Sequence, residues 1–221
     1  MTLRLAIFDC DGTLVDSQAD IANAMEAAFA LHALPAPSRA AIRRIVGLSL
    51  GEAIRQLCPD VDTVMANNLV QAYKDAFRAN RAAGRVEEPL YDGIAALVAE
   101  LDAAGWLLAV ATGKSDRGLA LCLERHALSG HFMTLQTADR HPSKPDPSMI
   151  EACLSETGAD RNACVMIGDT TFDMAMAVNA GVRAIGVDWG YHHPAELVSA
   201  GAEAVAGSVE DLRRLLKGWD A

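Results

Sequence analysis

Two carboxylates with a spacing suited to phosphate chemistry stand directly after the first apolar run of the chain. Asp9 and Asp11 follow residues 3–8, in the stretch Asp9-Cys10-Asp11-Gly12-Thr13-Leu14-Val15-Asp16-Ser17. Carboxylates two residues apart, followed by glycine, are held together in a tight turn. A solvated turn uses the same residue types, but this string after an apolar run favours a functional site over a plain turn.

Three further polar clusters follow apolar runs later in the chain. Each of them alone also fits a helix cap or a turn. Together with the first, they supply in chain order carboxylates, a hydroxyl, a lysine and more carboxylates. Phosphoryl transfer through a covalent intermediate needs that set, because it uses a nucleophile, an acid/base, phosphate clamps and ligands for a hard cation. The three clusters are Thr112-Gly113-Lys114-Ser115, Ser143-Lys144-Pro145-Asp146-Pro147 and Gly168-Asp169-Thr170-Thr171-Phe172-Asp173.

Alternating short apolar runs and helical patterns predict how these clusters are positioned. Such alternation is typical of a mostly parallel sheet covered by helices on both faces, a Rossmann-like doubly wound α/β fold. The clusters follow predicted strands, at the edge where open parallel sheets bind ligands. We expect strands at 3–8, 106–111, 132–136, 164–167, 184–187 and 202–206, and helices at 94–103, 118–126, 147–156, 174–179 and 209–216.

A helical block interrupts this alternation after the first strand. Residues 16–88 contain no strand-like run, and their helical pattern breaks only at Pro35-Ala36-Pro37, Gly47 and Pro59. We therefore expect an inserted all-helical cap domain over 16–88, and an α/β core domain formed by 1–15 and 89–221.

The composition excludes several classes of protein. Apolar residues make up 51% and charged residues 22% of the chain, as in globular proteins. A net charge of −10 argues against binding nucleic acid, and an acidic protein that handles phosphate should bring a cation to its site. No apolar run approaches the roughly 18 residues of a membrane span. With no signal-peptide pattern and five unpatterned cysteines, we expect a cytoplasmic protein with reduced thiols, in which His192-His193 is a solvated turn.

The four clusters resemble the four motifs of the haloacid dehalogenase superfamily, in the same order and across nearly the whole chain. The helical insert resembles the cap of the branch that contains phosphoglycolate phosphatase. One departure is Gly113, which stands where many phosphoglycolate phosphatases have Asn. The resemblance implies the core fold, the helical cap and a hydrolase acting on phosphate esters.

The resemblance also implies roles for individual residues. Asp9 would be the nucleophile that forms an aspartyl-phosphate, and Asp11 the general acid/base that protonates the leaving oxygen and then activates water. Thr112, Gly113 and Lys144 would bind the phosphoryl group.

The resemblance further implies Mg²⁺ as cofactor. Its ligands would be the carboxylates of Asp9 and Asp169 and the backbone carbonyl of Asp11. Asp173 would support the site, either through a metal-bound water or by orienting Lys144. Carboxylate oxygens suit Mg²⁺, and the cation lets one anion approach another.

The substrate is expected to be a small phosphorylated metabolite. The resemblance makes a phosphoglycolate-like compound the leading candidate, while sugar phosphates, nucleotides and pyrophosphate stay open. A break between cap helices places Arg43, Arg44, Gly47 and Ser49 where a substrate-reading loop could form, although exposed arginines at a helix end are an equally good interpretation. Asp11 argues against a dehalogenase, because displacing halide from carbon needs no acid. A β-phosphoglucomutase-like phosphotransferase stays open, as does a phospho-signalling receiver-like module.

Overall fold

Six parallel strands form a single sheet in the computed structural model, which describes residues 3–218. The strand order is β3-β2-β1-β4-β5-β6. Leu5 of β1 pairs with Leu107 of β2 on one side and with Cys164 of β4 on the other. The strands are β1 (Leu5–Phe8), β2 (Leu107–Thr112), β3 (Thr134–Thr137), β4 (Cys164–Gly168), β5 (Arg183–Val187) and β6 (Ala204–Ala206).

The first strand lies at the centre of the sheet. All four of its residues, Leu-Ala-Ile-Phe, are buried, as expected for a parallel strand covered on both faces. The chain then builds β2 and β3 on one side of β1, and β4, β5 and β6 on the other. The loop after β1 therefore lies at the topological switch point, where doubly wound sheets bind their ligands.

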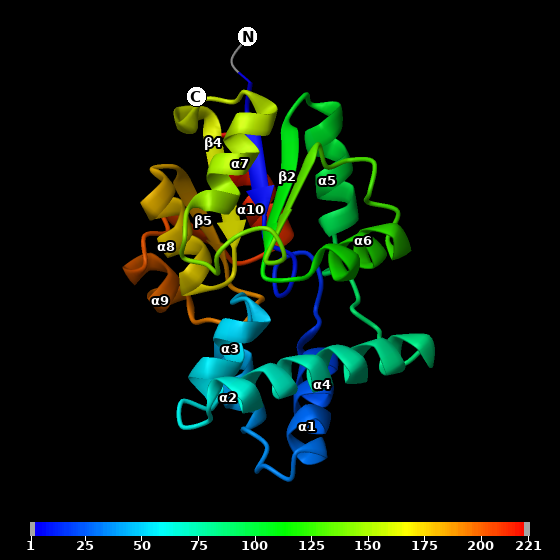
Figure 1. The fold of residues 1–221 in the computed structure, drawn as a ribbon. Helices are drawn as coiled ribbons and strands as arrows, with labels where there is room; N and C mark the ends of the chain where they lie inside the picture. The colour runs from blue at the N-terminus through cyan, green and yellow to red at the C-terminus, as the bar shows by residue number, and fades with distance from the viewer. Residues whose placement is uncertain (1–2, 219–221) are drawn as a thin grey trace.

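Helices cover both faces of the sheet (Figure 1). On one face α5, α6 and α10 pack against Phe8, Val110 and neighbouring side chains. On the other face α7, α8 and α9 pack against Ile7, Met166 and neighbouring side chains. These helices are α5 (Ile94–Ala103), α6 (Asp116–Arg125), α7 (Ser148–Thr157), α8 (Thr171–Ala180), α9 (Pro194–Ser199) and α10 (Val209–Lys217), with a short 3-10 turn at Arg161–Ala163.

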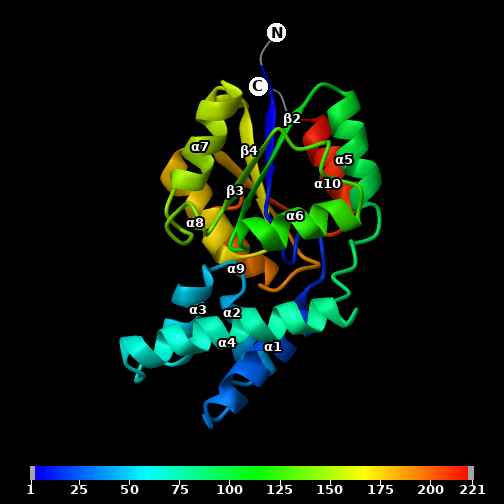
Figure 2. The ribbon, with the colours of Figure 1, turned by 45° about the vertical axis from the view of Figure 1, so that its right-hand side comes forward.

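Four helices after β1 form a separate layer at the carboxyl end of the sheet (Figures 1 and 2). Helices α1 and α4 pack along one another around Met25, Phe29 and Leu69. Two chain segments lie side by side where the layer joins the core, since Asp16 N donates to Pro89 O and Tyr91 N to Leu14 O. The cap helices are α1 (Gln18–Leu31), α2 (Arg39–Ile45), α3 (Leu50–Leu57) and α4 (Thr63–Ala82).

The sequence-based fold class is confirmed, with two local differences. Helix α8 begins at Thr171 rather than at 174, because Thr170 and Asp173 form a capping box that satisfies the first turn. Helix α9 was not predicted, although Pro194 in its first turn and Glu196 at its third position are helix-start signals. Among residues 3–218, no helix is long and apolar enough to cross a membrane.

Candidate active site

The carboxylate of Asp9 lies at the end of β1 and is buried, with 1% of the residue exposed. Its Oδ1 is 2.9 Å from Nζ of Lys144, an ion pair outside hydrogen-bond geometry, and its Oδ2 has no hydrogen-bond partner among the described residues. Lys144 is equally buried and also pairs with Oδ1 of Asp173, at 2.6 Å. One ammonium group thus joins two of the predicted clusters.

Asp173 is fully engaged by its neighbours. Its Oδ1 holds Lys144, and its Oδ2 accepts hydrogen bonds from the backbone N and the hydroxyl of Thr170, at 3.0 and 2.7 Å. Both oxygens of Asp173 are therefore occupied, one by the ammonium of Lys144 and the other by Thr170.

Asp169 faces Asp9 from the end of β4. Its Oδ1 accepts from the Thr13 hydroxyl at 2.9 Å, and its Oδ2 accepts from Tyr191 N at 2.9 Å. The loop after β1 approaches it closely, because a Cβ on Gly12 would stand 2.1 Å from Asp169 Oδ2. Gly12 also has a φ of +88°, so this turn needs glycine for both space and backbone conformation.

Burial of this acidic cluster changes the ionisation of its members. Burial raises the pKa of Asp9 to about 7, against the lowering effect of Lys144 and with a further rise from Asp173. Burial, with Asp173 and Asp9 nearby, also raises the pKa of Asp169 well above its usual value. Burial alone would lower the pKa of Lys144, but Asp173 and Asp9 outweigh it and raise that pKa.

The donor set of this cluster fits a hard divalent cation. One oxygen each of Asp9, Asp169 and Asp173 lies within 4.8 Å of the others. Oδ2 of Asp9 is buried without a hydrogen-bond partner. Each oxygen of Asp169 accepts one hydrogen bond and still has a lone pair that could bind a cation. Oxygen-only ligands of this kind suit Mg²⁺. Since both oxygens of Asp173 are held by Lys144 and Thr170, Asp9 and Asp169 are the carboxylates that would hold such an ion.

Asp11 belongs to a second ionic network, which connects the core with the cap. Its Oδ1 accepts from the Ser17 hydroxyl and lies 2.7 Å from Nζ of Lys114. Lys114 also pairs with the fully buried Glu88 at 2.8 Å, and Glu88 pairs with Arg81 of α4 at 2.6 Å. Burial would lower the pKa of Lys114, but Asp11 and Glu88 raise it well above its usual value. Lys114 is therefore a fixed positive charge beside Asp11.

Thr112 and Gly113 lie at the end of β2, under the cap. Thr112 is buried, and its Oγ1 accepts from Lys114 N at 3.3 Å. Gly113 contacts the cap backbone, because a Cβ at this position would stand 2.5 Å from Leu48 O and 2.7 Å from Gly47 O. Gly113, which has no side chain, thus lets the 46–49 loop of the cap come close to the loop after β2.

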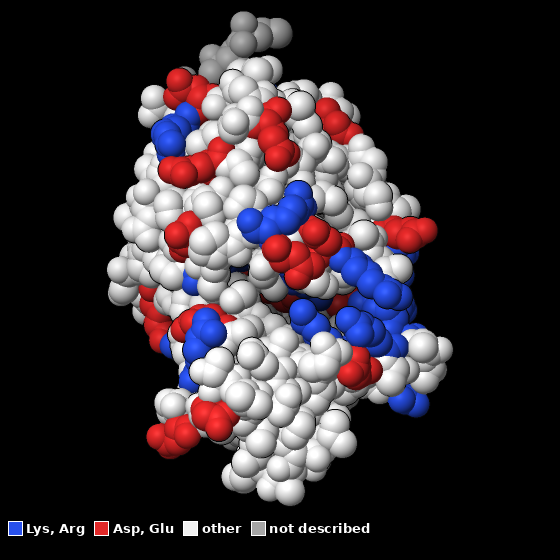
Figure 3. Space-filling view, in the orientation of Figure 1, with Lys and Arg blue, Asp and Glu red and all other residues white. Residues whose placement is uncertain are grey.

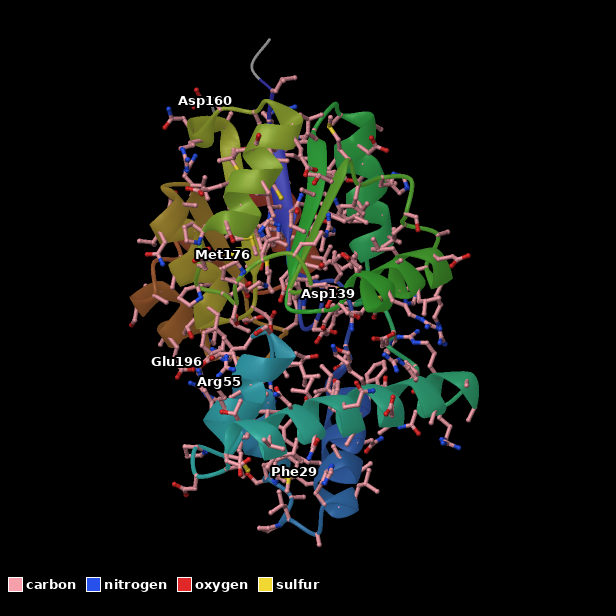
Figure 4. The ribbon with its side chains drawn as sticks, viewed as in Figure 1. Phe29, Arg55, Asp139, Asp160, Met176 and Glu196 are labelled. Carbon is pink, nitrogen blue, oxygen red and sulfur yellow. The ribbon has the colours of Figure 1, made fainter. Side chains whose placement is uncertain are left out.

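The four cap residues singled out in the sequence occupy different positions. Arg43 donates to Gly190 O at 2.6 Å, and Arg44 pairs with Glu196, which Figure 4 labels, at 2.7 Å. Ser49 N donates to Ser143 Oγ at 2.9 Å. These three hold the cap to the core and do not line the cavity beside Asp11, whereas Gly47 does.

The prediction of a solvated His192-His193 turn is wrong for His192. Only His193 is exposed, while His192 is 4% exposed. Its Nδ1 accepts from Thr171 N at 3.1 Å, and its Nε2 donates to Arg44 O at 3.1 Å. Burial lowers the pKa of this imidazole. It therefore joins the fourth motif to the cap as a neutral side chain.

Two residues of this site were not singled out in the sequence. Lys114 stands inside the second polar cluster and is one of only four lysines in the chain, but no role was expected for it. Nothing in the sequence pattern indicates that Glu88 is buried in this site. Its partners are Lys114 of the core and Arg81 of the cap, which come together only in the folded protein.

Comparisons with known proteins show which family the chain belongs to. The family described as "Haloacid dehalogenase-like hydrolase" matches residues 6–187. The chain belongs to this family. The protein named "Probable phosphatase IndB" from Dickeya dadantii (strain 3937) is 36% identical over 214 residues, which cover 94% of this chain and 91% of that protein.

Other relatives agree with this assignment. A phosphoglycolate phosphatase from Vibrio parahaemolyticus is 28% identical over 95% of this chain and 94% of its own length. The crystal structure of a hydrolase from Pseudomonas syringae has a TM-score of 0.87 at 26% identity and covers all of both chains. The protein is therefore a phosphatase of the haloacid dehalogenase-like family.

Proposed function

We propose that this protein is a Mg²⁺-dependent, cytoplasmic phosphatase that hydrolyses a small phosphomonoester through an aspartyl-phosphate on Asp9. The observation that carries the proposal is the state of Asp9, a buried carboxylate with an unpartnered oxygen next to Lys144. Two residues later, Asp11 faces the cavity between cap and core. The name of the Vibrio relative supports phosphoglycolate as one substrate to test.

The proposed reaction has two steps. A carboxylate oxygen of Asp9 attacks phosphorus, the bond from phosphorus to the leaving oxygen breaks, and Asp11 gives its proton to that oxygen. Asp11 then takes a proton from a water molecule, whose oxygen attacks the aspartyl-phosphate and releases phosphate and the free Asp9 carboxylate. Lys114 and Ser17 support this exchange by holding one oxygen of Asp11 in place.

The remaining residues serve binding in this proposal. Thr112, the Gly113 backbone and Lys144 bind the phosphoryl oxygens, with Asp173 orienting Lys144. Mg²⁺ would be held by Asp9, Asp169 and the Asp11 carbonyl, and it would neutralise charge between the phosphate and the nucleophile.

Mg²⁺ dependence is the direct test of this proposal. Removing divalent cations with EDTA should abolish turnover of p-nitrophenyl phosphate, and added Mg²⁺ should restore many turnovers per enzyme. A single long-lived stoichiometric label would indicate a receiver-like module instead. Mg²⁺ should also raise the unfolding temperature of the native chain, because it binds the folded state, and much less that of Asp169→Asn. Unchanged turnover in EDTA would contradict the proposed metal site.

We also propose that residues 16–88 act as a cap that closes the site against water. The support is the contact between the cap carbonyls of Gly47 and Leu48 and the phosphate-binding loop at Gly113.

Gly113→Ala is expected to lower kcat/KM by about 10- to 100-fold, since misplacing catalytic groups by about 1 Å has effects of that size. The new methyl group would overlap the two cap carbonyls, so the 46–49 loop must move away. Gly130→Ala is the matched control, because a Cβ there meets no atom within 4 Å. Steady-state kinetics on both variants check the prediction, and native kcat/KM in Gly113→Ala would contradict the role of the close contact.

A further inference from the structure

A cavity of about 530 Å³ lies between the cap and the core, and Asp11 forms part of its wall. The cap contributes residues of α1, of the 45–48 segment, of α3 and of α4, and the core contributes the 113–115 loop and residues of α6. Asp139, labelled in Figure 4, lines it from the core. Since Asp11 is the proposed acid for the leaving oxygen, the leaving group of a bound ester has to occupy this cavity.

The walls of the cavity are largely apolar and include a pair of aromatic rings. Tyr73 and Phe77 of α4 lie with ring centroids 5.9 Å apart, and Met25 and Leu48 are among the aliphatic neighbours. The Tyr73 hydroxyl makes no hydrogen bond with any residue in the described part of the chain. Largely apolar walls with a small number of polar groups are typical of sites for ring-bearing ligands. A two-carbon acid would leave most of this apolar surface in contact with water.

The same cavity is rich in positive charge, although the chain as a whole has a net charge of −10. Figure 3 shows Lys and Arg side chains gathered where cap and core meet. Against the two acidic residues Asp11 and Asp139, the lining contains five basic ones, which are Lys74, Arg78, Arg81, Lys114 and Arg117.

Only some of these cations are neutralised by neighbours. Arg81 and Lys114 share Glu88, and Lys114 also pairs with Asp11. Lys74 on the cap and Arg117 on the core have no ion pair within residues 3–218. One unpaired cation from the cap and one from the core, lining the same cavity, match a ligand that carries an anionic group.

We propose that the substrate is a phosphomonoester whose alcohol carries a ring-sized apolar body and a second anionic group. The ring packs against Tyr73 and Phe77, while Lys74 and Arg117 bind the second anion. This inference rests on the proposed function, because it places the phosphoryl group at Asp9. It predicts that phosphoglycolate, which has the second anion without the ring, is a poor substrate.

Three esters of alkyl alcohols test this inference, because their leaving groups have similar chemistry. They are 4-carboxybenzyl phosphate, with ring and carboxylate, benzyl phosphate, with the ring alone, and 2-phosphoglycolate, with the carboxylate alone. With Mg²⁺, kcat/KM should be highest for 4-carboxybenzyl phosphate. In the double variant Lys74→Met/Arg117→Met, the ratio of kcat/KM for 4-carboxybenzyl over benzyl phosphate should fall about tenfold. Lys217→Met is the control. Lys217 is exposed at the end of α10 and does not line the cavity, so this substitution should leave the ratio unchanged.

The outcomes separate this inference from the proposed function. A kcat/KM for 2-phosphoglycolate equal to or above that for 4-carboxybenzyl phosphate overturns the inference while leaving the phosphatase intact. An unchanged ratio in the double variant also overturns it. Absence of turnover with all three esters and with p-nitrophenyl phosphate overturns the proposed function. In that case, calorimetry measures the binding of both compounds to Asp9→Asn. The inference holds if 4-carboxybenzyl phosphate binds more tightly than 2-phosphoglycolate, and it is wrong if it does not.

Discussion

Asp9→Asn is expected to lower kcat on phosphomonoesters by about 10⁴-fold or more, the scale seen when a catalytic nucleophile is removed. The amide has nearly the shape of the carboxylate, but it lacks the charge and nucleophilicity needed to form the phosphorylated intermediate. Steady-state assays with Mg²⁺ measure the loss. Asp16→Asn is the matched control, because Asp16 is exposed in the same loop and an Asn oxygen still accepts from Gln18 N. Near-native turnover in Asp9→Asn would overturn Asp9 as nucleophile.

Asp9→Asn should also change how the free energy of unfolding depends on pH. Burial raises the pKa of Asp9 from 3.8 to about 7 in the folded protein, so the folded state favours the protonated form. Without metal, this stabilisation is complete below the unfolded pKa and is lost as the pH rises towards about 7. Asn stays neutral throughout, so the metal-free variant should lose less stability over that range than the native chain. Urea unfolding at pH 4.5 and 7.5 measures the difference, and equal losses would contradict it.

The meeting of Asp9 and Asp169 could be predicted from the sequence, because each directly follows an apolar run. In a parallel sheet the carboxyl ends of neighbouring strands lie at one edge, and β1 and β4 are neighbours. Residues far apart in sequence therefore converge without any knowledge of side-chain packing. The insertion of helices after β1 was equally accessible, since a long strand-free block cannot belong to an alternating core.

The contacts between the cap and the core could not be derived in this way. His192 shows the reason, because two adjacent histidines carry no periodicity that distinguishes a solvated turn from a buried bridge. The buried imidazole needs a hydrogen-bond partner, and that partner is the carbonyl of Arg44, which lies on α2, 148 residues earlier in the chain. Glu88 is similar, since its burial is compensated only by Arg81 and Lys114. The same holds for the cavity, whose cations come from both the cap and the core.

Lys144 offers the second large effect, because it is the buried cation on which the acidic cluster depends. Its side chain is 0% exposed and lies 2.9 Å from Asp9 and 2.6 Å from Asp173. Removing one partner of a buried ion pair leaves an uncompensated charge, which typically destabilises a protein by about 3–5 kcal/mol. Lys144→Met is therefore expected to lower the free energy of unfolding of the metal-free protein by about that amount at neutral pH, measured by urea titration. Lys217→Met, on the exposed end of α10, should change it by less than about 0.5 kcal/mol.

A second substitution distinguishes charge from packing as the cause of that loss. If the loss comes from uncompensated carboxylates, removing one of them should recover part of it, so Lys144→Met/Asp9→Asn should be more stable than Lys144→Met alone. If the loss comes from a packing defect left by the lysine stem, the second substitution should recover nothing. Lowering the pH should act in the same direction as the second substitution, because protonation of Asp9, whose pKa is already raised to about 7, removes the same charge. A double variant no more stable than Lys144→Met, with a loss that does not depend on pH, would show that Lys144 stabilises the fold by filling space rather than by neutralising the site.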